Sequence, residues 1–489
     1  MRKGFLSSIA ALTASAGLAW GQANMPSVAS FPGGPALPDP IPIGGPVQLT
    51  AGGQPTIIGP PQISGGAIPV GSDPIPFPSN GPQYPPPGNF GNFDLTGQGP
   101  PPQQGYGEPE APRLPHFYAN GEYLMMFMTA APINTPLITT SSPVAQGILG
   151  RPTTSVLFGA DEEGFGVVSG FRVTTGAWFD SNARVGLELS GFVMEQQASI
   201  FDAVSSARGV PTFARPYVDS TTGQQVSFLA AFPELAAGTI NALSETQVWG
   251  SEGNVLMNMY RSRPTSYSGW TINSLLGFRY VQVEEQLAIA SGSHVLPGNS
   301  IPFAGLFLVG PAVVGVSDSF LARNEFYGGN FGLQTQFRSG RFLFGMNSKL
   351  GVGNMHSRLD VNGYSTLTTG RAIADGTTQF NATSVQGGLF ANSGNIGRYI
   401  RDEFVVIPEL NLSLGCQLTS YLSTNIGYNL LYIPDIVRPG QQFGPAVNSS
   451  LVPTSFAYGQ SGFNPVARPT LETSEFYLHG LSFSMTFQY

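Results

Sequence analysis

The sequence predicts an all-β protein, an antiparallel transmembrane β-barrel of about 10 to 12 strands that follows a disordered N-terminal extension. Only 10% of the 489 residues are charged, against about 25% in soluble domains, which argues against a soluble enzyme. The longest apolar run beyond the N-terminus, 304–316, contains Gly310 and Pro311 and is shorter than the roughly 20 residues of a membrane helix. Few charges without long apolar runs are typical of a membrane barrel, whose strands carry apolar residues at alternate positions.

Residues 1–21 have the features of a secretory signal peptide. Arg2 and Lys3 precede a short apolar stretch, and small residues flank Trp20 just before Gln22. Without Arg2 and Lys3 the exported chain keeps 19 of its 21 basic residues against 29 acidic ones, so nucleic acid is a poor partner. The single cysteine, Cys416, excludes an intrachain disulfide and a cysteine-based zinc site, and we expect neither a metal nor a cofactor.

Residues 22–113 are rich in proline and glycine, with triple prolines at 85–87 and 100–102 and no basic residue before Arg113. Such a segment cannot bury a core, because proline removes backbone donors and favours extended polyproline conformations. We therefore predict a disordered spacer in the periplasm. It is either a passive leader or an arm that binds a partner.

Residues 114–489 form the predicted barrel. In 409–418, leucines and Cys416 occupy every second position and polar residues stand between them, as in a strand with two unlike faces. Similar segments form four hairpins with short turns near 180–183, 262–264, 339–340 and 419–421. With an opening strand at 117–128 and a closing strand at 476–489, ten strands are the minimum. A further hairpin within 207–235 gives twelve.

Longer connections alternate with the short turns, at roughly 129–165, 196–245, 285–325, 359–402 and 434–474. This asymmetry is typical of outer-membrane barrels, which have short periplasmic turns and longer extracellular loops. Both ends of the chain then lie in the periplasm.

Charged residues within the strands fall on the face opposite the aromatic and aliphatic side chains. We expect this face to line the lumen, because an Arg or Lys facing lipid at the midplane costs about 2–4 kcal/mol. The charges form either an eyelet that selects ions or an interior salt-bridge network, and a barrel of only ten strands favours the network. They are Glu122, Arg172, Glu188, Glu252, Arg279, Arg338, Lys349 and Glu409.

The last strand ends on an aromatic residue and alternates strictly, with Phe483, Met485, Phe487 and Tyr489 on one face. This pattern resembles the C-terminal signal by which bacterial barrels are recognised for assembly. It implies the barrel-assembly machinery as a partner. Closing the barrel against the first strand removes an apolar edge that would otherwise aggregate.

Several segments resemble the putative beta-barrel porin seven family, outer-membrane proteins of planctomycete bacteria, which are Gram-negative. The resemblance extends from about Tyr118 to the end of the chain. It implies a barrel in the outer membrane and gives no catalytic residue to carry over. Its carriers are GEYL at 121–124, PLITT at 136–140, SGFR at 169–172, GAWFD at 176–180, ARPY at 214–217 and LGFRY at 276–280.

Three functions are compatible with these features. The first is a non-enzymatic barrel in outer-membrane lipid that passes small solutes slowly through a narrow channel or acts structurally. The alternative is a surface binding or adhesion protein that displays long extracellular loops. A hydrolase is disfavoured, because in 354–357 (NMHS) alternation turns His356 away from Ser357. The acidic stretch at 161–163 is either a Ca²⁺ ligand set or a solvated loop. The oligomeric state is not predicted.

Overall fold

The computed structural model describes residues 116–489, apart from 263–267, 373–377 and 461–468. The predicted signal peptide and spacer, and part of the predicted turn at 262–264, lie outside the described residues. Among the residues that are described, no helix is long and apolar enough to cross a membrane.

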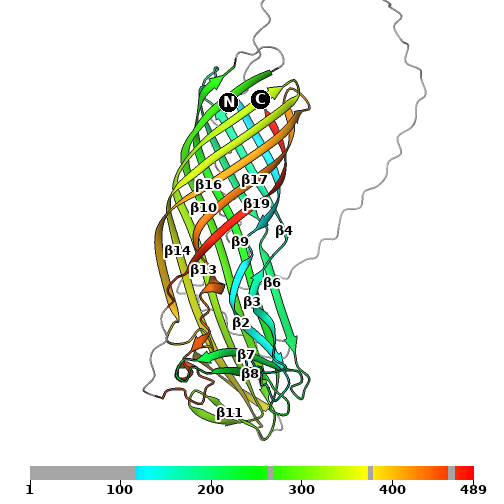
Figure 1. Ribbon diagram of the computed structural model, residues 1–489, viewed down its shortest axis with the longest axis vertical. Helices are drawn as coiled ribbons and strands as arrows, with labels where there is room; N and C mark the ends of the chain where they lie inside the picture. The colour runs from blue at the N-terminus through cyan, green and yellow to red at the C-terminus, as the bar shows by residue number, and fades with distance from the viewer. Residues whose placement is uncertain (1–115, 263–267, 373–377, 461–468) are drawn as a thin grey trace, which may run out of the picture. The chain divides into compact units, whose positions relative to one another are not determined.

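Ten antiparallel strands form a closed hydrogen-bonded ring (Figure 1). The first and last strands pair with each other, with Tyr118 opposite Gln488 and Met128 opposite Leu478. The all-β barrel is therefore confirmed, at the minimum predicted strand number. In ring order the strands are β1 (Phe117–Met128), β4 (Val167–Trp178), β5 (Val185–Met194), β9 (Ala236–Arg261), β10 (Ser268–Val295), β13 (Ala312–Ser339), β14 (Phe342–Ala372), β16 (Gly397–Gln417), β17 (Leu422–Val437) and β19 (Thr473–Gln488).

Four neighbouring strands are far longer than a membrane requires. β9, β10, β13 and β14 have 26, 28, 28 and 31 residues, whereas about 9–11 residues span a bilayer. The prediction of long loops at 196–245, 285–325 and 359–402 is therefore wrong in large part. These segments hold the continuing strands, which run on past the membrane.

The polarity of the two strand faces is exchanged part-way along the long strands. On the outer face of β14, the first part of the strand exposes Phe344, Met346 and Leu350, and we call the lipid-facing zone at this level of the barrel the membrane band. Asn354 and Arg358 follow on the same face. The inner face changes the opposite way, since on β10 buried Arg279 is followed by Val281, Val283, Leu287 and Ile289. Lipid surrounds the first part and water the second, so the apolar side chains move from the outside to the inside. This exchange removes the aromatic face on which the sequence-based strand limits depended.

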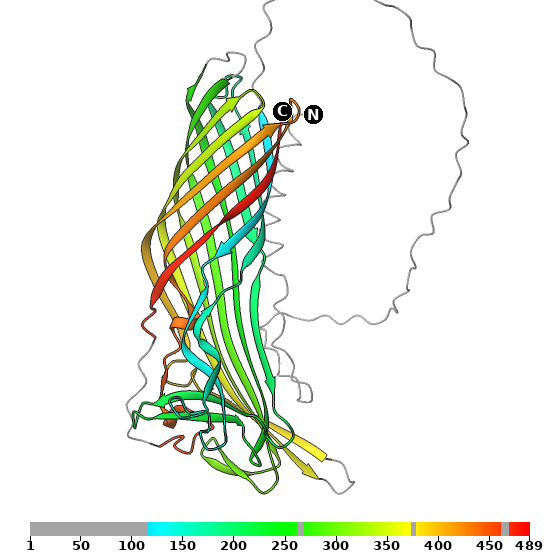
Figure 2. The same cartoon turned by 45° about the vertical axis from the view of Figure 1, so that its right-hand side comes forward.

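We call the part beyond this exchange the extension. Two further strands extend the sheet of long strands at its edges. β6 (Gln197–Val204) pairs with β9, and β15 (Thr378–Gln386) pairs with β14. A second sheet contains β18 (Ala446–Val447), β7 (Thr212–Asp219), β2 (Ala131–Ser141), β3 (Ser155–Glu163) and β8 (Gln225–Ala231) (Figure 2). Its side chains share one core with the inner faces of β9, β10, β13 and β14.

The hairpin predicted within 207–235 exists as β7–β8, but it does not enter the barrel wall. β7 pairs with β2, β8 and β18 instead, so the ring has ten strands and not twelve. A separate small hairpin consists of β11 (Ser300–Phe303) and β12 (Leu306–Val309). The connection between β17 and β19 includes two short 3₁₀ helices, η1 (Pro439–Gln441) and η2 (Ser449–Leu451).

Candidate functional site in the barrel lumen

Charged side chains meet inside the ring. Arg172 on β4 lies 3.4 Å from Glu122 on the neighbouring β1 and 3.6 Å from Glu409 on β16. Lys349 on β14 contacts Glu252 on β9. β4 and β16, and likewise β9 and β14, are not neighbours in the ring, so these contacts cross the lumen.

Arg279 lies at the centre of this group and is 2% exposed. Its Nε donates to Glu252 at 3.0 Å, its Nη2 donates to the same carboxylate at 2.6 Å, and it also contacts Glu409. Asn330 and Asn411 donate to these two carboxylates at 3.1 and 2.9 Å. Buried charges persist only when they are paired and hydrogen-bonded in this way. We call Glu122, Arg172, Glu188, Glu252, Arg279, Lys349 and Glu409 the ionic cluster.

Two of the predicted lumen charges, Glu188 and Arg338, do not take part in the contacts described above. Glu188 is 2% exposed and accepts a hydrogen bond from the Tyr118 hydroxyl. Arg338 is not brought to the ionic cluster at all. It lies near the end of β13 at the short turn, is exposed, and its Nε donates to the Gly340 carbonyl at 3.1 Å. Alternation assigned Arg338 to the inner face but carried no information about its depth in the barrel.

An apolar layer fills the lumen next to the ionic cluster, on the side of the extension. Every one of the ten ring strands contributes at least one buried side chain to it, and the alternation of the strands did not predict such a layer. Its members are Leu124, Met126 and Met128 (β1), Val168 (β4), Met194 (β5), Val248 (β9), Val281 and Val283 (β10), Phe326 (β13), Met355 (β14), Val405 and Ile407 (β16), Leu431, Ile433 and Ile436 (β17), and Phe476 and Leu478 (β19).

The space left beside the ionic cluster is small. A cavity lined by Arg172, Glu252, Arg279, Lys349 and Glu409, among others, has a volume of about 20 Å³. This is room for about one water molecule. A hydrated ion moving along the axis would also have to enter the apolar layer without polar partners, which costs several kcal/mol.

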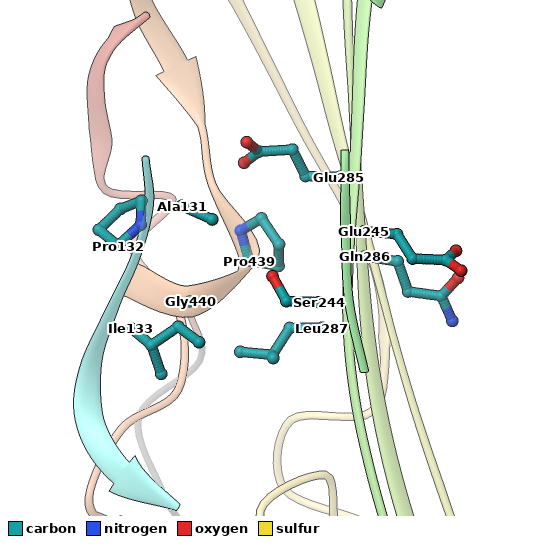
Figure 3. Close-up of a pocket in the computed structure, with 10 residues that line it drawn as sticks. All are labelled: Ala131, Pro132, Ile133, Ser244, Glu245, Glu285, Gln286, Leu287, Pro439 and Gly440. Atoms are coloured by element: carbon teal, nitrogen blue, oxygen red, sulfur yellow. The ribbon is translucent and has the colours of Figure 1, made fainter. Parts of the chain in front are cut away.

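A buried ion pair holds the connection after β17 inside the extension. Arg438 and Glu285 form two hydrogen bonds, Nε to Oε2 at 2.9 Å and Nη2 to Oε1 at 2.5 Å. Both side chains are at most 2% exposed. Figure 3 shows Glu285 pointing toward the side occupied by Pro439 and Gly440, whereas Glu245 points away from it.

The same connection packs closely against β2. A Cβ at Gly440 would lie 1.9 Å from the Pro132 carbonyl oxygen, so only glycine fits there. Asn324 on β13 adds a polar contact, because it accepts from the Val437 N–H and donates to the Val437 carbonyl, each at 2.9 Å. The connection is therefore part of the extension's interior.

A second buried pair joins β7 to β13. Arg215 and Asp318 are both fully buried, and Asp318 also accepts backbone N–H groups from Ala391 at 2.6 Å and Leu389 at 3.3 Å. The Arg215 guanidinium lies 5.1 Å from the centroid of the Phe390 ring. Neither Arg215 nor Arg438 is among the site residues predicted from the sequence. The available signal for both residues was that each is a charge within a connection that has few charges. Arg215 also lies in the ARPY segment at 214–217.

The NMHS segment does not assemble a catalytic group. His356 Nδ1 lies 2.9 Å from Asp402 on the outer face, whereas the Ser357 hydroxyl is buried and donates to Asn324. Asp161 and Glu162 are exposed on β3. Within the part of the chain that the structure describes, no group of three or more His, Cys, Asp or Glu residues could hold a metal ion.

The C-terminal residues Phe483, Met485, Phe487 and Tyr489 are exposed on the outer face of the closing strand. The Tyr489 N–H donates to the Phe117 carbonyl at 2.8 Å, and the Phe117 N–H donates to the Tyr489 carbonyl at 3.0 Å. These residues therefore lie along the seam that closes the barrel.

Comparison with solved structures finds distant barrels. The outer membrane protease OmpT from Escherichia coli is 9% identical over 76% of this chain and 97% of its own, with a TM-score of 0.29. A Pseudomonas aeruginosa FadL homologue is 9% identical over 76% and 89%, with a TM-score of 0.21. The P. putida toluene transporter TodX is 7% identical over 77% and 90%, with a TM-score of 0.19. Similarity this weak carries no argument about function.

No curated protein matches the chain. A family of barrel proteins does match, over residues 118–489, which is nearly the whole of the described structure. The chain belongs to the putative beta barrel porin-7 family (BBP7), a family of outer-membrane β-barrels.

Proposed function

We propose that this protein is a closed, non-enzymatic outer-membrane barrel that anchors the extension on the cell surface. The barrel is then a structural anchor in the outer membrane, the extension is a surface that displays loops for binding, and the lumen is not an open channel. The short turns and the spacer lie in the periplasm, as in other outer-membrane barrels, and the extension lies outside the cell.

The observation that carries this proposal is the apolar layer. Its side chains come from the wall strands themselves and are buried at 8% exposure or less. Opening the lumen would require the wall to separate, because no single loop could swing out and remove the layer. Apolar constrictions also exclude water and ions even where some space remains.

The lumen between the ionic cluster and the short turns is polar in character. Four buried amide atoms have no protein partner among the described residues, so we expect water to reach them. They are Asn254 Nδ2, Asn330 Oδ1, Asn347 Oδ1 and Asn411 Oδ1. This end of the lumen is then polar and hydrated, and solutes do not pass from it through the apolar layer.

The extension supports the display role. It has its own apolar core, two buried ion pairs and a second sheet, so it is a folded structure and not a set of loose loops. Rigid scaffolds that hold loops at a surface are commonly used for binding.

Planar-bilayer recording of the refolded full chain tests the proposal. We expect no stepwise conductance. Orientation is tested on intact cells, where an external protease should reach the extension before the short turns. Stepwise conductance in the wild-type protein would refute the closed barrel, whatever the result of the protease experiment.

A further inference from the structure

The hairpin β11–β12 exposes large apolar side chains at one end of the extension. Leu306, Phe307 and Val309 on β12 are 67–69% exposed, and Phe456, from the connection after β17, is 70% exposed. β11 lies at the end of the extension farthest from the short turns of the barrel (Figure 1). We call these four side chains the tip patch.

Contacts hold the two segments of the tip patch together. The centroids of the Phe307 and Phe456 rings lie 5.6 Å apart, and the Ala304 N–H donates to the Pro453 carbonyl at 2.7 Å. The strand pairing places Phe303 opposite Leu306 and Pro302 opposite Phe307, so Phe307 and Val309 lie on the face opposite that of Phe303, which is buried in the extension's core. Leu306 shares the face of Phe303 but is exposed. None of the four side chains of the tip patch belongs to that core.

Charge is missing from both segments that form the tip patch. Residues 296–317 and 439–467 contain no Asp, Glu, Lys or Arg. A charged partner would lose hydration at this surface without gaining a counter-charge. The chemistry of the patch therefore fits an uncharged, apolar partner.

The area of the tip patch decides between a protein and a lipid partner. Four side chains of this size at this exposure present about 500 Å² of apolar surface. A stable protein complex buries about 800 Å² on each partner. A bilayer needs no matching pocket, since each projecting side chain that leaves water contributes by itself.

We propose that the tip patch inserts into the lipid surface of an apposed membrane or vesicle. Since neither segment that forms the tip patch contains a basic residue, binding requires no anionic lipid and is insensitive to salt. This inference rests on the proposed function in one respect, because it places the extension outside the cell.

The test is flotation of the full chain, reconstituted in lipid nanodiscs, with added phosphatidylcholine vesicles. We expect the wild-type protein to float with the vesicles. Burial of one such side chain changes an equilibrium by about tenfold, so the L306S/F307S/V309S variant should lower vesicle binding at least tenfold. F456S should lower it less.

The matched control is I200S/V204S on β6, which removes two side chains of similar exposure, 66% and 69%, that are not part of the tip patch. It should bind vesicles as the wild type does. Unfolding of each variant in denaturant checks that the fold is intact.

Three results would overturn the proposal: no flotation of the wild type, equal loss in the β6 control, or binding only to anionic vesicles. Association of nanodiscs with one another without vesicles, abolished by the triple variant, would identify a second copy as the partner instead. Conductance of the wild type with normal flotation would refute the closed barrel alone, so the two failures are distinguishable.

Discussion

Replacing Arg438 with methionine should destabilise the extension strongly. The substitution keeps an apolar side chain of similar length but removes both hydrogen bonds to Glu285. It also removes the guanidinium that lies 5.8 Å from the centroid of the Phe476 ring. The Glu285 carboxylate is then left buried, and among the described residues only the Thr246 hydroxyl, at 3.4 Å, remains as a side-chain donor.

The magnitude follows from burial. Both side chains are 1–2% exposed, so solvent cannot replace the lost partner. Breaking a pair of this kind costs about 3–5 kcal/mol, most of which is the penalty of the unpaired charge. The double variant R438M/E285M buries no unpaired charge, so it should be more stable than R438M alone, with a coupling energy of at least about 2 kcal/mol.

The assay is denaturant unfolding of the refolded protein in detergent micelles, followed by tryptophan fluorescence. Hydrogen exchange at the Val437 N–H, which donates to Asn324, reports on the end of β17, directly before Arg438. The control is R398M, whose guanidinium is 60% exposed and pairs with Asp360 at 2.7 Å. It should cost no more than about 1 kcal/mol. A loss below about 1 kcal/mol for R438M, or coupling near zero in the double variant, would refute the reasoning.

Further predictions concern the barrel. Arg279→Met should cost about 3–5 kcal/mol of unfolding free energy, whereas Arg338→Met should change it by less than about 0.5 kcal/mol; equal effects would contradict the placement of Arg338 outside the ionic cluster. Leu350→Arg faces lipid and should cost about 2–4 kcal/mol in bilayer refolding, while Asn362→Arg, farther along the same face of β14, should cost about 0–1 kcal/mol. Similar costs would show that the membrane band is misplaced. Deleting Tyr489 should lower the amount of folded barrel recovered from outer membranes, because its backbone bonds to Phe117 close the seam. Unchanged recovery would separate this residue from assembly.

The barrel ring could be predicted because its information is local. Alternation of apolar and polar residues in segments such as 409–418 identifies a strand and its two faces without knowledge of any other strand. Short turns between such segments then give antiparallel neighbours. The ionic cluster followed in the same way, since charges on the lipid-opposed face of several strands can only point into the lumen.

The errors have one physical origin. Past the membrane the outer face meets water, so apolar residues such as Leu287 and Ile289 turn inward and the aromatic outer face disappears. Strand limits defined by that face therefore end too early. β7–β8 was recognisable as a hairpin, but only its pairing with β2 and β18 places it outside the ring.

The sequence by itself determined an antiparallel ring of at least ten strands, the lipid and lumen faces of those strands, and the residue types available in the lumen, because all of these depend on neighbours two residues apart. The tertiary structure alone decided that the lumen is closed and that the connections are folded. Arg438 finds Glu285 across 153 residues and Arg215 finds Asp318 across 103. No local period encodes such contacts, because they depend on which chain segments the closed barrel brings to the same depth.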